Sequence, residues 1–213
     1  MGSARDIVAP WGGDSRLGTR VLHHVVSALK ERKVTLGGED VTHDVTVFDP
    51  LEVFAEGGAL AESGAEIRKP HFYYAKGAAP AGMEAMKEAI AAADAYVIVA
   101  PEYNHTVPPA LSGMMGNFGG SNFKAKPSAI VCYSVGPFAG ARVGVALRPM
   151  LSELGCIPVS KMACLPSPAD LFEEDGTAKD PEARMLHQIP ALFGQLEWMA
   201  VAMANGRRDL GTF

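Results

Sequence analysis

The chain has 213 residues, with 19 lysines and arginines against 24 aspartates and glutamates, and a formal net charge of −5. This length fits one domain, residues 1–213, which can bury roughly seventy per cent of its unfolded surface without disulfides or a structural metal. The acidic balance and the lack of a long basic run argue against nucleic acid as a partner.

Apolar runs and cysteines point to a soluble protein of a reducing compartment. The apolar runs stop near about ten residues, short of the ~20 that span a bilayer, and the amino terminus lacks a basic-then-apolar signal pattern. Cys132, Cys156 and Cys164 show no CxxC spacing and no histidine at metal spacing. We interpret them as buried structural thiols, expect no metal site and no membrane partner, and predict a cytoplasmic location.

The amino-terminal part of the chain predicts a loop, a helix and a strand. Met1 to Ser15 is rich in proline and glycine and is typical of a loop. Apolar residues then recur at steps of three and four from Arg16 to about Lys33, which indicates an amphipathic helix. His43 to Phe48 alternates and is β-branched, so it predicts a strand. Residues 51–81 show no regular pattern.

The rest of the chain alternates between helical and strand-like segments. The predicted helices are Gly82 to Ala93, Pro109 to Phe118, Ala141 to Leu154, and Pro181 to Ala204 with a bend at Pro190. The predicted strands are Ala95 to Ala100, Ser128 to Tyr133, and Ile157 to Ala163. Alternation of helices with nearly all-apolar strands predicts an α/β fold in which helices cover both faces of a parallel sheet.

This pattern has one gap, because the first predicted helix has no strand in front of it. Two explanations remain open. Either the first strand lies upstream of Met1 and is truncated, or Arg5 to Pro10 forms a strand. We favour truncation.

Three loops rich in glycine or proline follow strand positions, namely Gly2 to Arg16, Pro101 to Pro109 and Ser134 to Gly140. The carboxyl ends of parallel strands meet at one edge of a sheet, where helix amino termini offer unpaired N–H groups to an anion. The first loop adds the hydroxyls and guanidinium groups that bind a phosphate. These side chains are Ser3, Arg5, Ser15 and Arg16.

The middle loop places an aromatic ring, Tyr103, between Glu102 and Asn104, with prolines on both sides. A ring and amides on a restricted backbone suit a flat polar ligand, and our hypothesis is a flavin. Simple packing of Tyr103 and plain turns at Gly136 and Gly140 remain the alternatives. The chain has no Gly-x-Ser-x-Gly motif, so a hydrolase finds little support.

Three motifs resemble the NADPH-dependent FMN reductase family, flavodoxin-like proteins that include quinone, azo-dye and chromate reductases. Gly2-Ser-Ala-Arg5 looks like the family's G-S-x-R phosphate loop. Pro101-Glu-Tyr-Asn104, continued by Pro108 and Leu111, resembles its P-E-Y-N…P-x-L signature. The segment Tyr133 to Arg142 is similar to its third flavin loop.

The resemblance implies a single flavodoxin-like domain, a three-layer sandwich whose parallel strands run in the order 2-1-3-4-5. It implies FMN bound without a covalent link, NAD(P)H as reductant, and a homodimer or homotetramer. It assigns the FMN phosphate to Ser3 and Arg5, and less directly to Ser15 and Arg16, which an insert separates from the first motif. It assigns the ring system to the following residues: Pro101, Glu102, Tyr103, Asn104, Ser134, Gly136 and Gly140.

The function implied is an oxidoreductase that passes a hydride from NAD(P)H to FMN and then to a small, quinone-like acceptor, in a ping-pong cycle. The cofactor carries this chemistry, so no catalytic side chain is expected. A flavodoxin-type electron carrier and a non-catalytic flavodoxin-like module remain alternatives.

Overall fold

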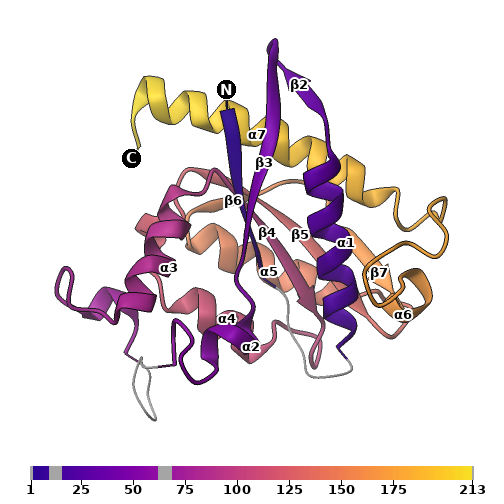
Figure 1. Ribbon diagram of the computed structural model, residues 1–213, viewed down its shortest axis with the longest axis horizontal. Helices are drawn as coiled ribbons and strands as arrows, with labels where there is room; N and C mark the ends of the chain where they lie inside the picture. Colours follow the sequence, from indigo (N-terminus) through magenta and orange to yellow (C-terminus); the bar gives the residue numbers. More distant parts are fainter. Residues whose placement is uncertain (1, 10–15, 62–68, 213) are drawn as a thin grey trace.

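The computed structural model describes residues 2–9, 16–61 and 69–212, and this part of the chain forms a seven-stranded sheet between two layers of helices (Figure 1). The strand order is β2-β3-β1-β4-β5-β6, and β7 also pairs with β5. All pairings are parallel except that of β2 with β3. The strands are β1 (Gly2–Ala9), β2 (Val34–Leu36), β3 (Glu39–Val47), β4 (Ala95–Pro101), β5 (Lys126–Ser134), β6 (Cys156–Pro158) and β7 (Ala163–Pro166).

The strand in front of the first helix is β1, in agreement with the second of the two explanations, and the predicted loop over residues 2–9 is corrected. Gly2 to Val8 pairs with β3 on one side, and Asp6 to Ala9 pairs with β4 on the other. Only its last three residues, Ile7, Val8 and Ala9, form an apolar run in the sequence. Backbone hydrogen bonds to a neighbouring strand on each side hold β1 in the sheet. Such pairing does not require an apolar pattern in the local sequence, so the apolar pattern did not indicate this strand.

Two further details of the sheet depart from prediction. A hairpin precedes the predicted strand, because β2 pairs antiparallel with β3 across a turn in which Gly37 and Gly38 both have positive φ. The predicted strand over 157–163 is divided into β6 and β7, which pair with different halves of β5. Three-layer α/β architecture with a parallel sheet is nevertheless as predicted.

Helices cover both faces of the sheet, and each face has its own apolar core. On one face, α1 and α7 pack through Val21, Val25 and Leu192. On the other, α3, α4 and α5 pack through Met83, Leu111 and Leu147. The helices are α1 (Leu17–Glu31), α2 (Pro50–Phe54), α3 (Ala81–Ala92), α4 (Pro109–Gly116), α5 (Ala141–Glu153), α6 (Pro168–Leu171) and α7 (Gln188–Leu210), with 3-10 turns at His71–Tyr73 and Gly120–Asn122.

The last helix begins later than the predicted Pro181, which changes the place within it of the proline where a bend was predicted. Because α7 begins at Gln188, Pro190 lies in its first turn, where the missing N–H breaks no intrahelical bond. Among the described residues, no helix combines the length and apolarity that crossing a bilayer requires.

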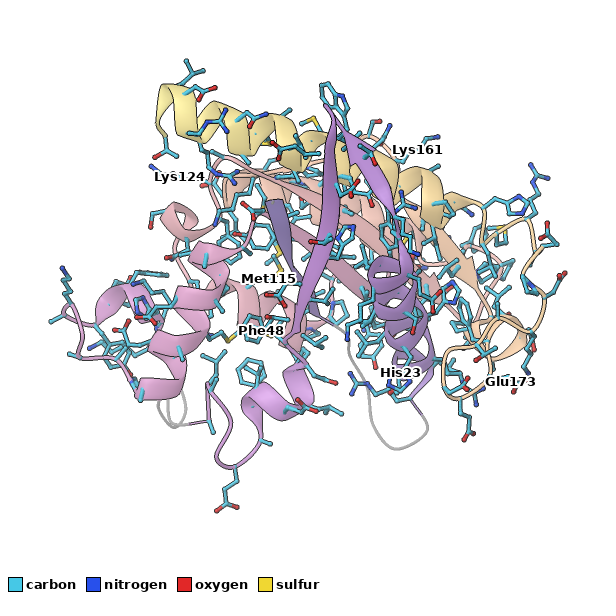
Figure 2. The ribbon with its side chains drawn as sticks, turned by 45° about the horizontal axis from the view of Figure 1, so that its top comes forward. His23, Phe48, Met115, Lys124, Lys161 and Glu173 are labelled. Atoms are coloured by element: carbon cyan, nitrogen blue, oxygen red, sulfur yellow. The ribbon has the colours of Figure 1, made fainter. Side chains whose placement is uncertain are left out.

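Packing under the α4 side is close but not complete. Phe48, which follows β3, and Met115 of α4 lie near each other in Figure 2 and line a small apolar cavity of about 30 Å³ with Tyr96.

On the opposite face, the loop after α6 packs on α1, where Figure 2 shows His23 and Glu173 on neighbouring segments. In that contact Nδ1 of His24 donates to the carbonyl of Gly176 at 3.1 Å.

A buried charge cluster joins three elements at the far end of the sheet. Glu197 of α7, with a side chain only 1% exposed, accepts hydrogen bonds from Arg32 at the end of α1 and from Nε2 of His43 on β3 at 3.0 Å. Burial raises the pKa of Glu197, but the hydrogen bonds and charges of Arg32 and His43 outweigh it, so the net pKa is lowered. The cluster therefore holds α7 against α1 and β3 as a carboxylate.

Candidate functional site

The carboxyl ends of β3, β4 and β5 lie at one edge of the sheet, the lower edge in Figure 1, where α1 also begins. The loops that follow these strands therefore face one another, as predicted for a parallel sheet. Residues 10–15 connect β1 to α1 and lie outside the described part of the chain, so Ser15 is not placed. The edge is built from three described segments: residues 48–49, 101–108 and 134–140.

The phosphate loop predicted from Gly2-Ser-Ala-Arg5 is not at this edge. These residues form the first half of β1, and Ser3 lies about 20 Å from the carboxyl end of the strand at Ala9, at roughly 3.3 Å per residue. Arg5 pairs with Asp44 in the middle of the sheet. The loop prediction for this motif is corrected, because residues inside a paired strand cannot form the turn that wraps a phosphate.

Arg16 is the described residue of the first segment that does reach the edge. It is the N-cap residue of α1 and its Nη1 lies 2.5 Å from Oδ2 of Asp49, with the two side chains 11% and 8% exposed. Asp49 also accepts a hydrogen bond from Leu51 N at 3.0 Å, which caps α2. The ion pair thus fixes the guanidinium beside the start of a helix.

Two donors of this guanidinium have no partner in the described part of the chain. Nε and Nη2 of Arg16 are buried and make no hydrogen bond among the described residues. A buried donor left unsatisfied costs about 1–3 kcal/mol, and the first turn of α1 contains no acidic residue or side-chain cap to use it. Guanidinium donors beside a helix amino terminus have the chemistry of a phosphate site.

The loop after β4 is a tight turn at Tyr103 to Thr106. Tyr103 N donates to Thr106 O at 3.2 Å and Thr106 N donates to Tyr103 O at 2.9 Å. The two residues between them, Asn104 and His105, have φ values of 50° and 62°, the left-handed pair of a type I′ turn. The turn holds Tyr103 rigidly with its side chain 42% exposed.

Glu102 joins this turn to the loop after β5. Its carboxylate accepts from the backbone N–H of Arg142 and from Nη1 of Arg142, both at 3.0 Å, and so caps α5. Burial raises the pKa of Glu102, but the hydrogen bonds and charge of Arg142 dominate together and leave that pKa lowered. The carboxylate positions the two loops and is not an open ligand group.

Ser134, Gly136 and Gly140 lie together in the loop between β5 and α5. Oγ of Ser134 donates to Gly136 O at 3.2 Å, which folds the loop back on itself. A Cβ added to Gly136 meets nothing within 4 Å, whereas one added to Gly140, at φ +75°, would lie 2.7 Å from the N and O of Tyr133. The glycine at 140 is therefore required by packing on β5, and the one at 136 borders open space.

Tyr133, at the end of β5, connects the two halves of the edge. Burial is the largest influence on its phenol and raises the pKa well above the usual range. The positive charge of Arg16 opposes this rise, whereas Tyr103 and Asp49 add to it. The charges of the Arg16–Asp49 pair and of the Tyr103 phenol therefore both act on the pKa of this buried phenol.

The structure thus brings most of the predicted residues to one edge and adds others. The predicted residues gathered there are Arg16, Pro101, Glu102, Tyr103, Asn104, Ser134, Gly136 and Gly140. Sequence reasoning missed two residues. Asp49 could have been found from its place directly after a strand. Arg142 is the last residue of the segment that resembles the third flavin loop, but no role was assigned to it. Exposed apolar side chains, Val135 and Phe138, also lie here, with the Arg142 guanidinium 4.3 Å from the Phe138 ring centre. No group of three or more metal-ligating side chains occurs among the residues described.

The sequence is similar to several flavin and quinone reductases. It is 35% identical over 119 residues to an NAD(P)H-dependent FMN reductase of Pseudomonas aeruginosa, covering 54% of this chain and 64% of the relative. It is 31% identical over 109 residues to a quinone reductase of Pseudomonas putida, covering 48% and 58%. A quinone reductase of Escherichia coli is 36% identical over 85 residues, covering 38% and 45%. Each match spans less than two thirds of the relative's own length.

Solved structures show the same fold. The flavoenzyme NAD(P)H:(acceptor) oxidoreductase FerB from Paracoccus denitrificans aligns with a TM-score of 0.65 at 17% identity, covering 92% of this chain and 98% of that one. An oxidoreductase from Corynebacterium diphtheriae aligns with a TM-score of 0.66 at 15% identity, covering 94% and 98%. These likenesses concern the fold, and the predicted flavodoxin-like sandwich is confirmed.

A family model described as NADPH-dependent FMN reductase matches residues 2–167, a range that runs from β1 to the end of β7 and contains every described segment of the candidate site. The chain belongs to the NADPH-dependent FMN reductase family.

Proposed function

We propose that this chain is an FMN-dependent oxidoreductase that takes electrons from NAD(P)H and passes them to quinone-like or other electron-poor acceptors. Family membership and the names of the relatives support the reaction class. The observation that carries the proposal for this particular chain is the pair of buried, unpartnered donors on Arg16. They fit the phosphate of FMN, which is a dianion with acceptor oxygens only.

In this proposal Arg16 binds the FMN phosphate and Asp49 positions Arg16. Nη1 of Arg16 is engaged in the ion pair with Asp49, so Nε and Nη2 can donate hydrogen bonds to phosphate oxygens. The amino terminus of α1 adds unpaired N–H groups and partial positive charge at the same place. The predicted phosphate roles of Ser3 and Arg5 have no part in the proposal, since both residues lie within β1.

The flavin ring is assigned to the two loops that Glu102 links. Pro101 has no N–H, and the N–H groups of Glu102 and Tyr103 already donate to Tyr133 O and Thr106 O at 3.1 and 3.2 Å. Among the four residues Pro101, Glu102, Tyr103 and Asn104, we therefore assign the backbone N–H of Asn104 to a polar edge of the ring. Exposed Tyr103 on one loop and Phe138 on the other supply apolar surface that a flat ring would cover.

When bound, FMN supplies two-electron chemistry between NAD(P)H and the acceptor. The chain's own part is to hold the ring, to offer backbone donors at its edge and to leave one face open to two substrates in turn. A ping-pong cycle follows, because reductant and acceptor would use the same open face. No side chain needs to act as an acid, a base or a nucleophile in this scheme.

Absorption spectra and steady-state kinetics test the proposal together. Protein mixed with FMN and freed of excess ligand is expected to keep the flavin bands and to oxidise NAD(P)H faster when a benzoquinone is added, with parallel double-reciprocal plots. Protein that fails to retain FMN contradicts the proposal. Retention of FMN without NAD(P)H oxidation favours the flavodoxin-type carrier instead.

The remaining expectations stay predictions. Assembly as a homodimer or homotetramer can be measured by light scattering, and a cytoplasmic location by fractionation.

A further inference from the structure

Two of the three cysteines lie side by side on neighbouring strands, although 32 residues separate them in the chain. Cys132 of β5 and Cys164 of β7 are register partners, and their sulfur atoms are 3.3 Å apart. Neighbouring strands are spaced about 4.8 Å apart, which lies within the range of Cα separations that a disulfide bridges. Both thiols are free in this structure.

The space around the pair is kept open by a glycine. A Cβ added to Gly144 of α5 would lie 2.9 Å from Sδ of Met162 and 3.2 Å from Sγ of Cys132. The helix therefore presents bare backbone where the sulfur atoms sit. Any larger residue at 144 would press on Met162 and Cys132, so the glycine lets α5 pack directly against these sulfur atoms.

The two thiols differ in burial and in hydrogen bonding. Cys132 is fully buried, and Cys164 is half-buried. Sγ of Cys132 donates to Sγ of Cys164; this bond lowers the pKa of Cys164 against the opposing effect of burial, and it raises the pKa of Cys132. The thiol of the half-buried residue, Cys164, is thus the one that ionises first, and Cys132 carries the shared proton.

The third cysteine, Cys156, differs from Cys164 in burial and in the direction of its pKa shift. It lies on β6, is buried, and its pKa is raised to about 12, chiefly by burial. A buried thiol with a raised pKa reacts slowly, because the thiolate is the nucleophile. Cys156 therefore serves as an internal control for any reaction of the pair.

We propose that Cys132 and Cys164 form a reversible redox site, which a hydroperoxide converts to an intramolecular disulfide. The thiolate of Cys164 attacks the O–O bond, becomes a sulfenic acid and releases one oxygen as water after protonation. The thiol of Cys132 then displaces the sulfenic oxygen as a second water and forms the S–S bond. Two thiols lose two electrons, hydrogen peroxide gains two, and the products are one disulfide and two waters.

The proposed disulfide is reversible by thiol–disulfide exchange. A thiolate of an added dithiol attacks one of the two sulfur atoms and forms a mixed disulfide, which the second thiol of the reagent then resolves. A dithiol such as dithiothreitol is expected to restore both thiols.

Peptide mapping tests the proposal on the purified protein without NAD(P)H, so the outcome does not depend on the proposed reductase activity. Trypsin cleaves after Arg142 and Lys161, which places the three cysteines in three different peptides. After treatment with hydrogen peroxide, two of three thiols are expected to disappear with a loss of about 2 Da. The non-reduced digest should contain the Cys132 peptide linked to the Cys164 peptide, and dithiothreitol should separate them.

Two variants separate the pair from general oxidation. In Cys132→Ser, dimedone should trap a sulfenic acid on Cys164 and no internal cross-link should form. In Cys156→Ser, the cross-link should form as in the unmodified protein. Retention of all three thiols, modification of Cys156 at the same rate as Cys164, or cross-links only between molecules would each overturn the proposal. The digest of the unmodified protein decides the question even if a variant fails to fold.

Discussion

Asp49 holds Arg16 through an ion pair, Nη1 to Oδ2 at 2.5 Å, and leaves two buried guanidinium donors, Nε and Nη2, without a partner among the described residues. An arginine at a helix amino terminus is unfavourable to the helix dipole, and a carboxylate beside it removes only part of that cost. A phosphate at the remaining donors would satisfy both the arginine and the helix. This relationship underlies the proposed orientation of FMN, with its phosphate toward α1 and its ring toward the two linked loops.

Substitution by alanine should change the free energy of unfolding much more at Gly140 than at Gly136. Gly140→Ala places a Cβ 2.7 Å from the Tyr133 backbone at a φ of +75°, so we expect a loss of at least about 1–3 kcal/mol in the free energy of unfolding. Gly136→Ala meets nothing within 4 Å, and its change should stay within about 0.5 kcal/mol. Urea unfolding measures both. Equal losses in the two variants would show that the strand contact at 140 is not what requires glycine.

Glu102 and Arg142 should be coupled in a double-mutant cycle. Their bond joins two loops, but Arg142 is 37% exposed, so solvent screens part of the interaction. We expect a coupling of about 0.5–1 kcal/mol in urea unfolding of Glu102→Gln, Arg142→Met and the double variant. The exposed pair Arg208 and Asp209, adjacent in the sequence, supplies a comparison cycle. Additive effects at Glu102 and Arg142 would contradict the role of this pair as a link between the loops.

Removal of the carboxylate of Glu197 should lower the free energy of unfolding far more than loss of the Glu102–Arg142 pair. Glu197→Gln leaves Arg32 without its carboxylate partner in a site where the glutamate side chain is only 1% exposed. Breaking one partner of a buried ion pair costs about 3–5 kcal/mol. The control is Asp209→Asn on the exposed pair, which should not show a comparable loss, because solvent screens that pair. A denaturation midpoint of Glu197→Gln close to that of the unmodified protein would rule out a stabilising role for the cluster.

His24 gives the stability a defined dependence on pH. Burial lowers its pKa below the ordinary 6.5, although the hydrogen bond to Gly176 opposes this shift. The unfolded chain therefore binds the proton first, and stability is expected to fall as pH drops through 6.5 toward the lowered folded-state pKa. The slope of unfolding free energy against pH between 7 and about 5.5 should be reduced in His24→Gln. His187, which is mostly exposed, provides the control. An unchanged slope in His24→Gln would mean that other groups govern this pH range.

Much of the fold was readable from sequence because its central strands are buried on both faces. All seven residues of β4 are buried, so the strand appears as a continuous apolar run. The amphipathic pattern of α1 likewise gave its bounds to within two residues. By contrast, β1 contains Arg5 and Asp6 and is defined by its two neighbours in the sheet, which are remote in sequence. The hairpin before β3 did carry a readable signal, the pair Gly37 and Gly38.

The candidate site was predictable in position but only partly in composition. Loops after parallel strands meet at one edge on general grounds, and the loops that contain Tyr103 and Ser134 do lie at one edge of the sheet. The pairs Arg16 with Asp49 and Glu102 with Arg142 arise from tertiary contacts across tens of residues. The motif at Ser3 and Arg5 misled, since a short match to a phosphate loop does not reveal whether the backbone there is a turn or a strand.

Comparison of FMN with riboflavin, which lacks the phosphate, tests the central claim most directly. We expect the unmodified protein to bind FMN more tightly than riboflavin, and Arg16→Ala to weaken FMN binding by about 1.5–3 kcal/mol, roughly 10- to 150-fold, with riboflavin affinity unchanged. Lys30→Ala removes the same charge from the exposed end of α1 and is the matched control. Fluorescence titration measures all six affinities. Equal affinity of Arg16→Ala and the unmodified protein for FMN would contradict the account.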